Sequence, residues 1–166
     1  MRTAIVSAVV LILAFILTAR ATCSNREIVP FLGKWSGGFE VESIRDGADT
    51  PQERERYRLQ GYVQVYATRR SFKMHLQGEQ EDLDLAGFWT FRGQRLTLKV
   101  SEIKIDDHGG ADARNPNQKF ISPEELNGAY SKPIVLDLSP DKKQYTGLLI
   151  GMGKLIGRHR FVKDSF

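Results

Sequence analysis

The sequence predicts an all-β fold: an antiparallel β-barrel of about eight strands with one short helix near residues 123–128. Three observations predict it. Apolar and polar residues alternate with a period of two along most of the chain, as in strands that bury one face. Short segments rich in Gly, Pro, Asp and Ser separate these stretches, and short connections join antiparallel neighbours. Closing such a sheet into a barrel removes its exposed edges.

The alternation places eight strands along the chain. They lie at residues 34–43, 57–67, 72–77, 83–91, 96–105, 133–138, 145–150 and 154–163. The parity of the apolar residues switches at Ser101-Glu102, which predicts a β-bulge there. Residues 44–55 and 106–119 are polar and predict loops. In the segment from Ser122 to Gly128, Ser122 is an N-cap, Pro123 takes the first helical position and Glu125 completes a capping box, so a helix begins here and ends at Gly128.

The beginning of the chain predicts export. Met1-Arg2 is positively charged, residues 3–18 are uncharged and apolar, and Ala19-Arg20-Ala21 fits the small-x-small pattern of a cleavage site. We therefore expect a signal peptide at 1–21, a lead-in at 22–32 and a single barrel domain at 33–166. The alternative is an uncleaved anchor, for which the apolar run is barely long enough.

The cysteine content indicates the compartment. Cys23 is the only cysteine, so no disulfide forms within the chain, and no N-x-[ST] glycosylation acceptor occurs. Both features favour a secreted or periplasmic protein of a bacterial envelope. A lipid on Cys23 would require an apolar residue where Arg20 stands. Membrane association is expected only if the leader stays uncleaved or Cys23 is lipidated.

The charge balance excludes one class of partner. The chain has 24 Lys and Arg against 20 Asp and Glu, and two of the basic residues, Arg2 and Arg20, belong to the predicted leader. The remainder carries 22 against 20, a net charge of only +2. Nucleic-acid binding usually requires a strongly basic face, so we expect no nucleic-acid partner.

Gly33-Lys34-Trp35 opens the first strand, and residues 155–161 form the last one. These two ends resemble the calycin barrels, the group of lipocalins, fatty-acid-binding proteins and avidins. The resemblance implies a lipocalin-like barrel in which Trp35 closes one end. It also implies that an arginine late in the last strand, Arg158 or Arg160, packs over that Trp. The T-D-Y signature of lipocalins is absent, so no ligand is implied.

Candidate chemistry is sparse. His159 shares the inward face of the last strand with Leu155 and Phe161, where it either orients a ligand or is a satisfied core residue. His75 faces solvent. The segment 106–112 resembles a Ca²⁺ loop, but its spacing fails the EF-hand pattern and predicts a solvated loop. We expect no catalytic residues, no metal and no cofactor, and the candidate ligand-binding residues are Trp35, Arg158 and His159.

Three functions remain open at this point. The first is an exported, non-enzymatic barrel of the cell envelope that binds a small apolar or amphipathic ligand. The second is a filled barrel that serves as a structural or protein-interaction domain through outward residues such as Tyr62 and Tyr66. The third is a hydrolase that uses His159 or the segment 106–112. The bulky inward residues favour the second over the first if they fill the interior; these are Leu59, Val63, Val65, Phe72, Met74 and Leu76.

Overall fold

The computed structural model describes residues 28–79, 81–107 and 121–164. The chain forms two compact units, Met1–Phe31 and Leu32–Phe166. The described part of the first unit contains the 3-10 turn η1 (Val29–Phe31). The elements of the second unit are β1 (Gly33–Ile44), α2 (Pro51–Arg56), β2 (Leu59–Val65), η2 (Thr68–Arg70), β3 (Ser71–Gln77), β4 (Glu81–Arg92), β5 (Arg95–Asp107), α3 (Pro123–Tyr130), β6 (Ile134–Leu138), β7 (Gln144–Gly147), β8 (Ile150–Met152) and β9 (Leu155–Lys163).

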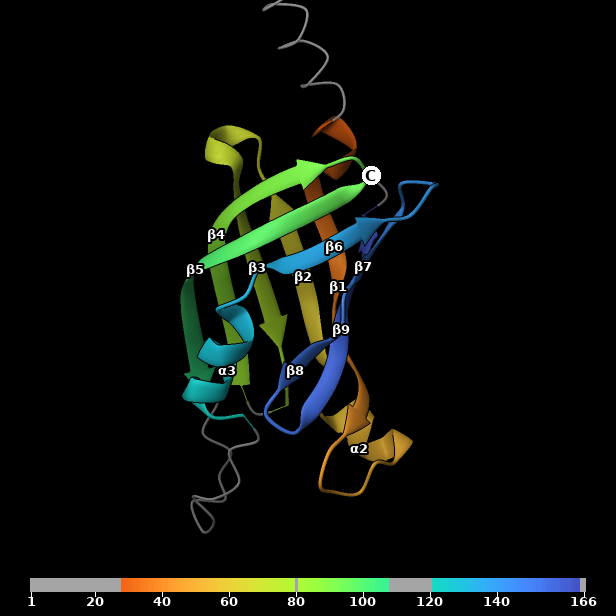
Figure 1. The fold of residues 1–166 in the computed structure, drawn as a ribbon, viewed down its shortest axis with the longest axis vertical. Helices are drawn as coiled ribbons and strands as arrows, with labels where there is room; N and C mark the ends of the chain where they lie inside the picture. Colours follow the sequence, from red (N-terminus) through yellow and green to blue (C-terminus); the bar gives the residue numbers. More distant parts are fainter. Residues whose placement is uncertain (1–27, 80, 108–120, 165–166) are drawn as a thin grey trace, which may run out of the picture. The chain divides into compact units, whose positions relative to one another are not determined.

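Eight of these strands close into an antiparallel barrel, as the sequence predicts (Figure 1). The strands follow the order β1-β2-β3-β4-β5-β6-β7-β9, and β9 returns to pair with β1. The ninth strand, β8, continues β7 along the same partner, β9. The predicted bulge is confirmed, because Ala86 pairs with Glu102 while Gly87 pairs with Val100, which leaves Ser101 as the extra residue.

The sequence expectations fail at several places. β5 runs on to Asp107, two residues into the expected loop 106–119. The segment 44–55 is not entirely a loop, since it includes most of α2, and β2 begins only at Leu59. Gly128 does not end α3, which continues to Tyr130. The predicted strand 145–150 is interrupted at Leu148 and Leu149, because the pairing with β9 shifts by one residue between β7 and β8.

Large side chains fill the barrel. The largest of those less than 2% exposed are Trp35, Phe39, Phe72, Met74, Leu76, Leu83, Leu85, Trp89, Leu96, Tyr130, Tyr145 and Phe161. A void that admitted one water molecule would leave accessible surface on its walls, and these side chains have essentially none. The described interior is therefore packed, with no room for a ligand among these residues.

One side of the barrel is closed by a helix instead of a strand. β6 pairs only with residues 95–98 of β5, so the rest of β5 has β4 as its only described strand partner. α3 packs against both β8 and β5 and lies between them in Figure 1. Its Leu126 and Tyr130 are buried. We call this place, where α3 stands between the two strands, the seam.

Candidate functional site

His159 lies in the core, as its strand parity predicts. Its side chain is fully buried, stacks on Phe161 with a centroid distance of 5.8 Å and meets the edge of Phe39 at 5.4 Å. Nε2 lies 3.4 Å from the hydroxyl of Tyr130. Burial lowers the pKa of His159 to about 4, and a backbone interaction with Gly38 opposes that shift only in part. His159 is thus a neutral core residue enclosed by aromatic rings.

The structure does not bring the three candidate ligand-binding residues together. Trp35 is buried at 0% exposure and packs on Tyr145 with a centroid distance of 4.1 Å. The arginine expected over Trp35 is not there, because Arg158 is on the outer face and binds the Glu42 carboxylate, and Arg160 pairs with Glu40. Register explains this, since Trp35 pairs with Lys163.

Lys163 takes the place that the resemblance assigns to arginine. Its Nζ lies 5.3 Å from the centroid of the Trp35 ring. A cation over an indole face is attracted by the ring quadrupole. The register also places Arg158 opposite Glu40, five residue pairs from Trp35 along the strands.

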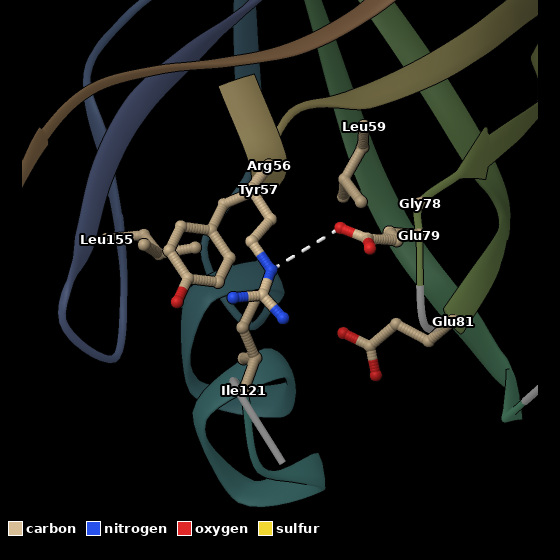
Figure 2. A pocket seen from close by; sticks show the side chains of 8 residues that line it. All are labelled: Arg56, Tyr57, Leu59, Gly78, Glu79, Glu81, Ile121 and Leu155. Atoms are coloured by element: carbon tan, nitrogen blue, oxygen red, sulfur yellow. Dashed lines mark ion pairs between the residues drawn. The ribbon is translucent and has the colours of Figure 1, made fainter. Parts of the chain in front are cut away.

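A small pocket lies between the end of α2, the β3–β4 turn, Ile121 just before α3, and the start of β9. Figure 2 shows Arg56 extending across it, with the Tyr57 ring on one side and Glu79 and Glu81 on the other. Nε of Arg56 is 3.4 Å from the Glu79 carboxylate. Desolvation raises the pKa of Tyr57, and Glu53 contributes to the same shift. The volume is about 30 Å³, which holds a water or two but no ligand.

A second hollow runs along the seam. Its volume is about 230 Å³, and it lies between the C-terminal part of α3 and the segment that joins β7 to β8. Leu148 and Leu149 line it and are 51% and 56% exposed. Nothing in the described chain covers these two leucines.

A larger hollow lies on the outer face of β2, β3, β4 and β5, and we call it the outer hollow. Its volume is about 300 Å³, at the lower end of the range typical of ligand pockets. The strand register builds it, because Tyr62 pairs with His75, His75 with Asp84 and Asp84 with Lys104. The residues that line it are Tyr62, Lys73, Met74, His75, Asp84, Leu85, Ala86, Glu102 and Lys104.

The polar groups of the outer hollow are held in place by one another. Nδ1 of His75 is 2.8 Å from the Asp84 carboxylate, and the ring centroids of His75 and Tyr62 are 5.8 Å apart. Nζ of Lys34 lies 4.5 Å from the centroid of Tyr62. Ala86 pairs with Lys73 on β3 and with Glu102 on β5. Because its side chain is only a methyl group, it leaves a depression between these two longer side chains.

The outer hollow contains one pair of side chains with possible acid–base chemistry. His75 and Asp84 form a pair of the kind that activates a nucleophile, but there is no Ser, Thr or Cys among the described residues that line the hollow. No group of three or more metal-ligating side chains occurs in residues 28–79, 81–107 and 121–164. Residues 108–112 of the segment expected to be a solvated loop, His108 among them, lie outside the described residues.

Sequence reasoning missed this hollow because it treated outward polar residues as solvated. The missing information was the register between strands. The predicted turn at 68–70 would set Tyr62 opposite Leu76, whereas the observed turn has four residues, 67–70, and sets Tyr62 opposite His75. The next turn spans residues 78–81 and sets His75 opposite Asp84.

None of the helices in the described residues is long and apolar enough to span a bilayer. Comparison of the chain with family models, with curated proteins and with the solved structures finds no match.

Proposed function

We propose that this chain is an exported, non-enzymatic protein of the bacterial cell envelope, a filled β-barrel that binds its partner through the outer hollow. The packed interior carries the proposal. Binding inside the barrel would require displacing side chains from a core that excludes even water, and that costs several kcal/mol for each large residue. Binding on the surface has no such cost.

The outer hollow is a better binding site than the pocket beside Arg56 or the seam hollow. The pocket beside Arg56 is about ten times smaller in volume. The seam hollow is lined by a short helix end and an interrupted strand, which are less rigid supports than a continuous sheet. The outer hollow lies on β2, β3 and β4, which are each paired on both sides, and on the part of β5 that pairs with β4, so the backbone beneath it is held in a fixed position before a partner arrives.

Sedimentation with isolated bacterial cell envelopes tests this proposal. We compare the wild-type protein with Ala86→Arg, which fills the outer hollow, and with Leu149→Arg, which places the same side chain at the seam. The wild-type protein and Leu149→Arg should sediment with the envelopes, while Ala86→Arg should be retained at least tenfold less. Circular dichroism verifies that both variants fold.

Two results contradict the proposal. One is equal retention of the wild-type protein and Ala86→Arg, because binding would then not involve the outer hollow. The other is loss of retention in Leu149→Arg alone, which would move the binding site to the seam.

A further inference from the structure

We propose that the ligand of the outer hollow is a neutral saccharide chain. This inference deepens the proposed function and depends on it. It rests on three features of the outer hollow: the balance of its charges, its pair of rings, and its continuation along β2 and β3.

The charges of the hollow cancel. Two lysines, Lys73 and Lys104, oppose two carboxylates, Asp84 and Glu102, and Lys104 is already paired with Glu102 at 3.2 Å. A strongly charged ligand, such as a phosphate or a polyamine, would meet as much repulsion as attraction here. A neutral ligand that both donates and accepts hydrogen bonds fits better.

Hydroxyl groups match this mixture of side chains. An ammonium group only donates hydrogen bonds and a carboxylate only accepts them. One sugar hydroxyl can accept from Lys73 and donate to Asp84 or Glu102 at the same time. Hydrogen bonds to charged groups are stronger than neutral ones, so a few such contacts suffice to orient a ligand. An apolar ligand would instead leave these charged groups desolvated and unpaired.

The two rings supply the apolar contact that a sugar requires. Tyr62 and His75 lie side by side on adjacent strands, with an interplanar angle of 40°. The C–H groups on one face of a sugar ring are apolar and pack well against an aromatic surface. Nζ of Lys34 lies over one face of the Tyr62 ring, so we expect the ligand to pack on the opposite face.

The hollow continues along the strands, which indicates a chain rather than a single sugar. Gln60 and Gln77 are paired with each other, and each lies two residues from a ring of the outer hollow on the same face of its strand. They line an adjoining shallow hollow of about 330 Å³. Amide side chains both donate and accept hydrogen bonds, so the chemistry of the first hollow continues into the second.

A polypeptide would find no backbone partner beside the two rings. Extended peptides commonly bind by adding a strand to an exposed sheet edge. β2, β3 and β4 are each paired with a strand on both sides, so the face under the rings offers no edge, and β5 lacks a second described strand partner only on the far side of the hollow, at Glu102 and Lys104. A saccharide needs none.

Titration with two oligosaccharides tests the inference directly. The probes are chitotetraose and cellotetraose, and binding is followed by calorimetry and by amide chemical shifts. At least one probe should bind saturably and shift the amides of β2 and β3. Tyr62→Ala and Ala86→Arg should each weaken this binding at least tenfold. The matched control is Tyr66→Ala, the same substitution at an outward tyrosine that does not line the hollow, and it should leave the affinity within twofold of wild type.

The envelope assay separates failure of this inference from failure of the proposed function. Envelopes should lose the protein after one of two treatments: periodate, which cleaves sugars with adjacent hydroxyls, or lysozyme, which hydrolyses chains of β-1,4-linked N-acetylated sugars. Protease-treated envelopes should retain it. If Ala86→Arg abolishes sedimentation but neither glycan treatment does, the outer hollow binds something other than a saccharide, and this inference is wrong while the proposed function stands. Oligosaccharide binding that is unchanged in Tyr62→Ala and Ala86→Arg also overturns it, because the sugar site then lies elsewhere.

Discussion

At the scale of single residues, His159 shows how burial decides chemistry. A histidine on the surface titrates near neutral pH, but this one is enclosed by Phe39, Phe161 and Tyr130. Charging it inside the barrel would separate a cation from water without a carboxylate to pair with it. It therefore remains neutral in the folded state down to a pH of about 4.

This shift makes folding sensitive to acid. The unfolded chain binds a proton at His159 below a pH of about 6.5, whereas the folded chain binds it only near 4. Between these values the unfolded state holds more protons, so stability falls as the pH falls, by about 3 kcal/mol in total from this group. We expect His159→Phe to remove that part of the slope. Urea unfolding at pH 7, 5.5 and 4 measures it.

A suitable reference for this experiment is Tyr130→Phe, because it removes the hydroxyl that would lose its partner in His159→Phe. The stability of the single variant Tyr130→Phe is compared at each pH with that of the double variant Tyr130→Phe/His159→Phe. An unchanged slope in the double variant would contradict the assignment of acid sensitivity to His159.

Sequence reasoning worked for His159 and failed for Arg158, and the reason is physical. Alternation is a local property, so it correctly placed His159 inward and Arg158 outward. Which residue lies over Trp35 depends on the register between β1 and β9, two paired strands that come from opposite ends of the domain's sequence. No local pattern fixes that register, and the resemblance to other barrels supplied the wrong residue.

At the scale of elements, α2 was missed although its start resembles that of α3. Thr50-Pro51-Gln52-Glu53 has the same spacing as Ser122-Pro123-Glu124-Glu125, and the Thr50 hydroxyl accepts a hydrogen bond from the Glu53 amide. α2 has no buried residue, so apolar periodicity gave no sign of it. The capping pattern was the better predictor here because capping does not depend on burial.

The two glycines Gly128 and Gly61 should respond to the same substitution with opposite signs. Gly128 lies inside α3, and a Cβ there would meet no atom within 4 Å apart from the backbone of its own helix and its chain neighbours, so Gly128→Ala should stabilise the protein by about 1 kcal/mol. Gly61 lies in β2, where a Cβ would come within 1.9 Å of the His75 carbonyl oxygen, so Gly61→Ala should destabilise it by about 3 kcal/mol. Thermal unfolding of both variants measures this, and a loss of stability in Gly128→Ala would contradict it.

At the scale of the whole molecule, the fold class followed from sequence, whereas the filling of the barrel required the structure. Alternation identifies which residues point inward but not how closely they meet. Eight strands can enclose either side chains alone or a small ligand. Here Trp35, Trp89, Tyr130 and Tyr145 occupy the interior together, and bulk of this kind decides between the two cases.

A packed interior predicts that the purified protein carries no ligand inside the barrel. Native mass spectrometry of the protein purified from its producing cells should give the mass of the polypeptide with no apolar molecule bound. A fluorescent fatty acid added to the protein should gain no emission. A stoichiometric lipid in the spectrum would show that the core opens, and it would return the ligand-carrier hypothesis to first place.

The seam is the part of this barrel that opens most easily, although the barrel has eight paired strands. While α3 is docked, Leu126 and Tyr130 close the barrel between β5 and β8. Once α3 detaches, two strand edges lie open on one molecule, and each is a template for the edge of another. Detaching eight residues requires much less free energy than unfolding eight strands. We infer that the shelf life of concentrated solutions of this protein follows the opening of α3 and not the melting temperature of the barrel.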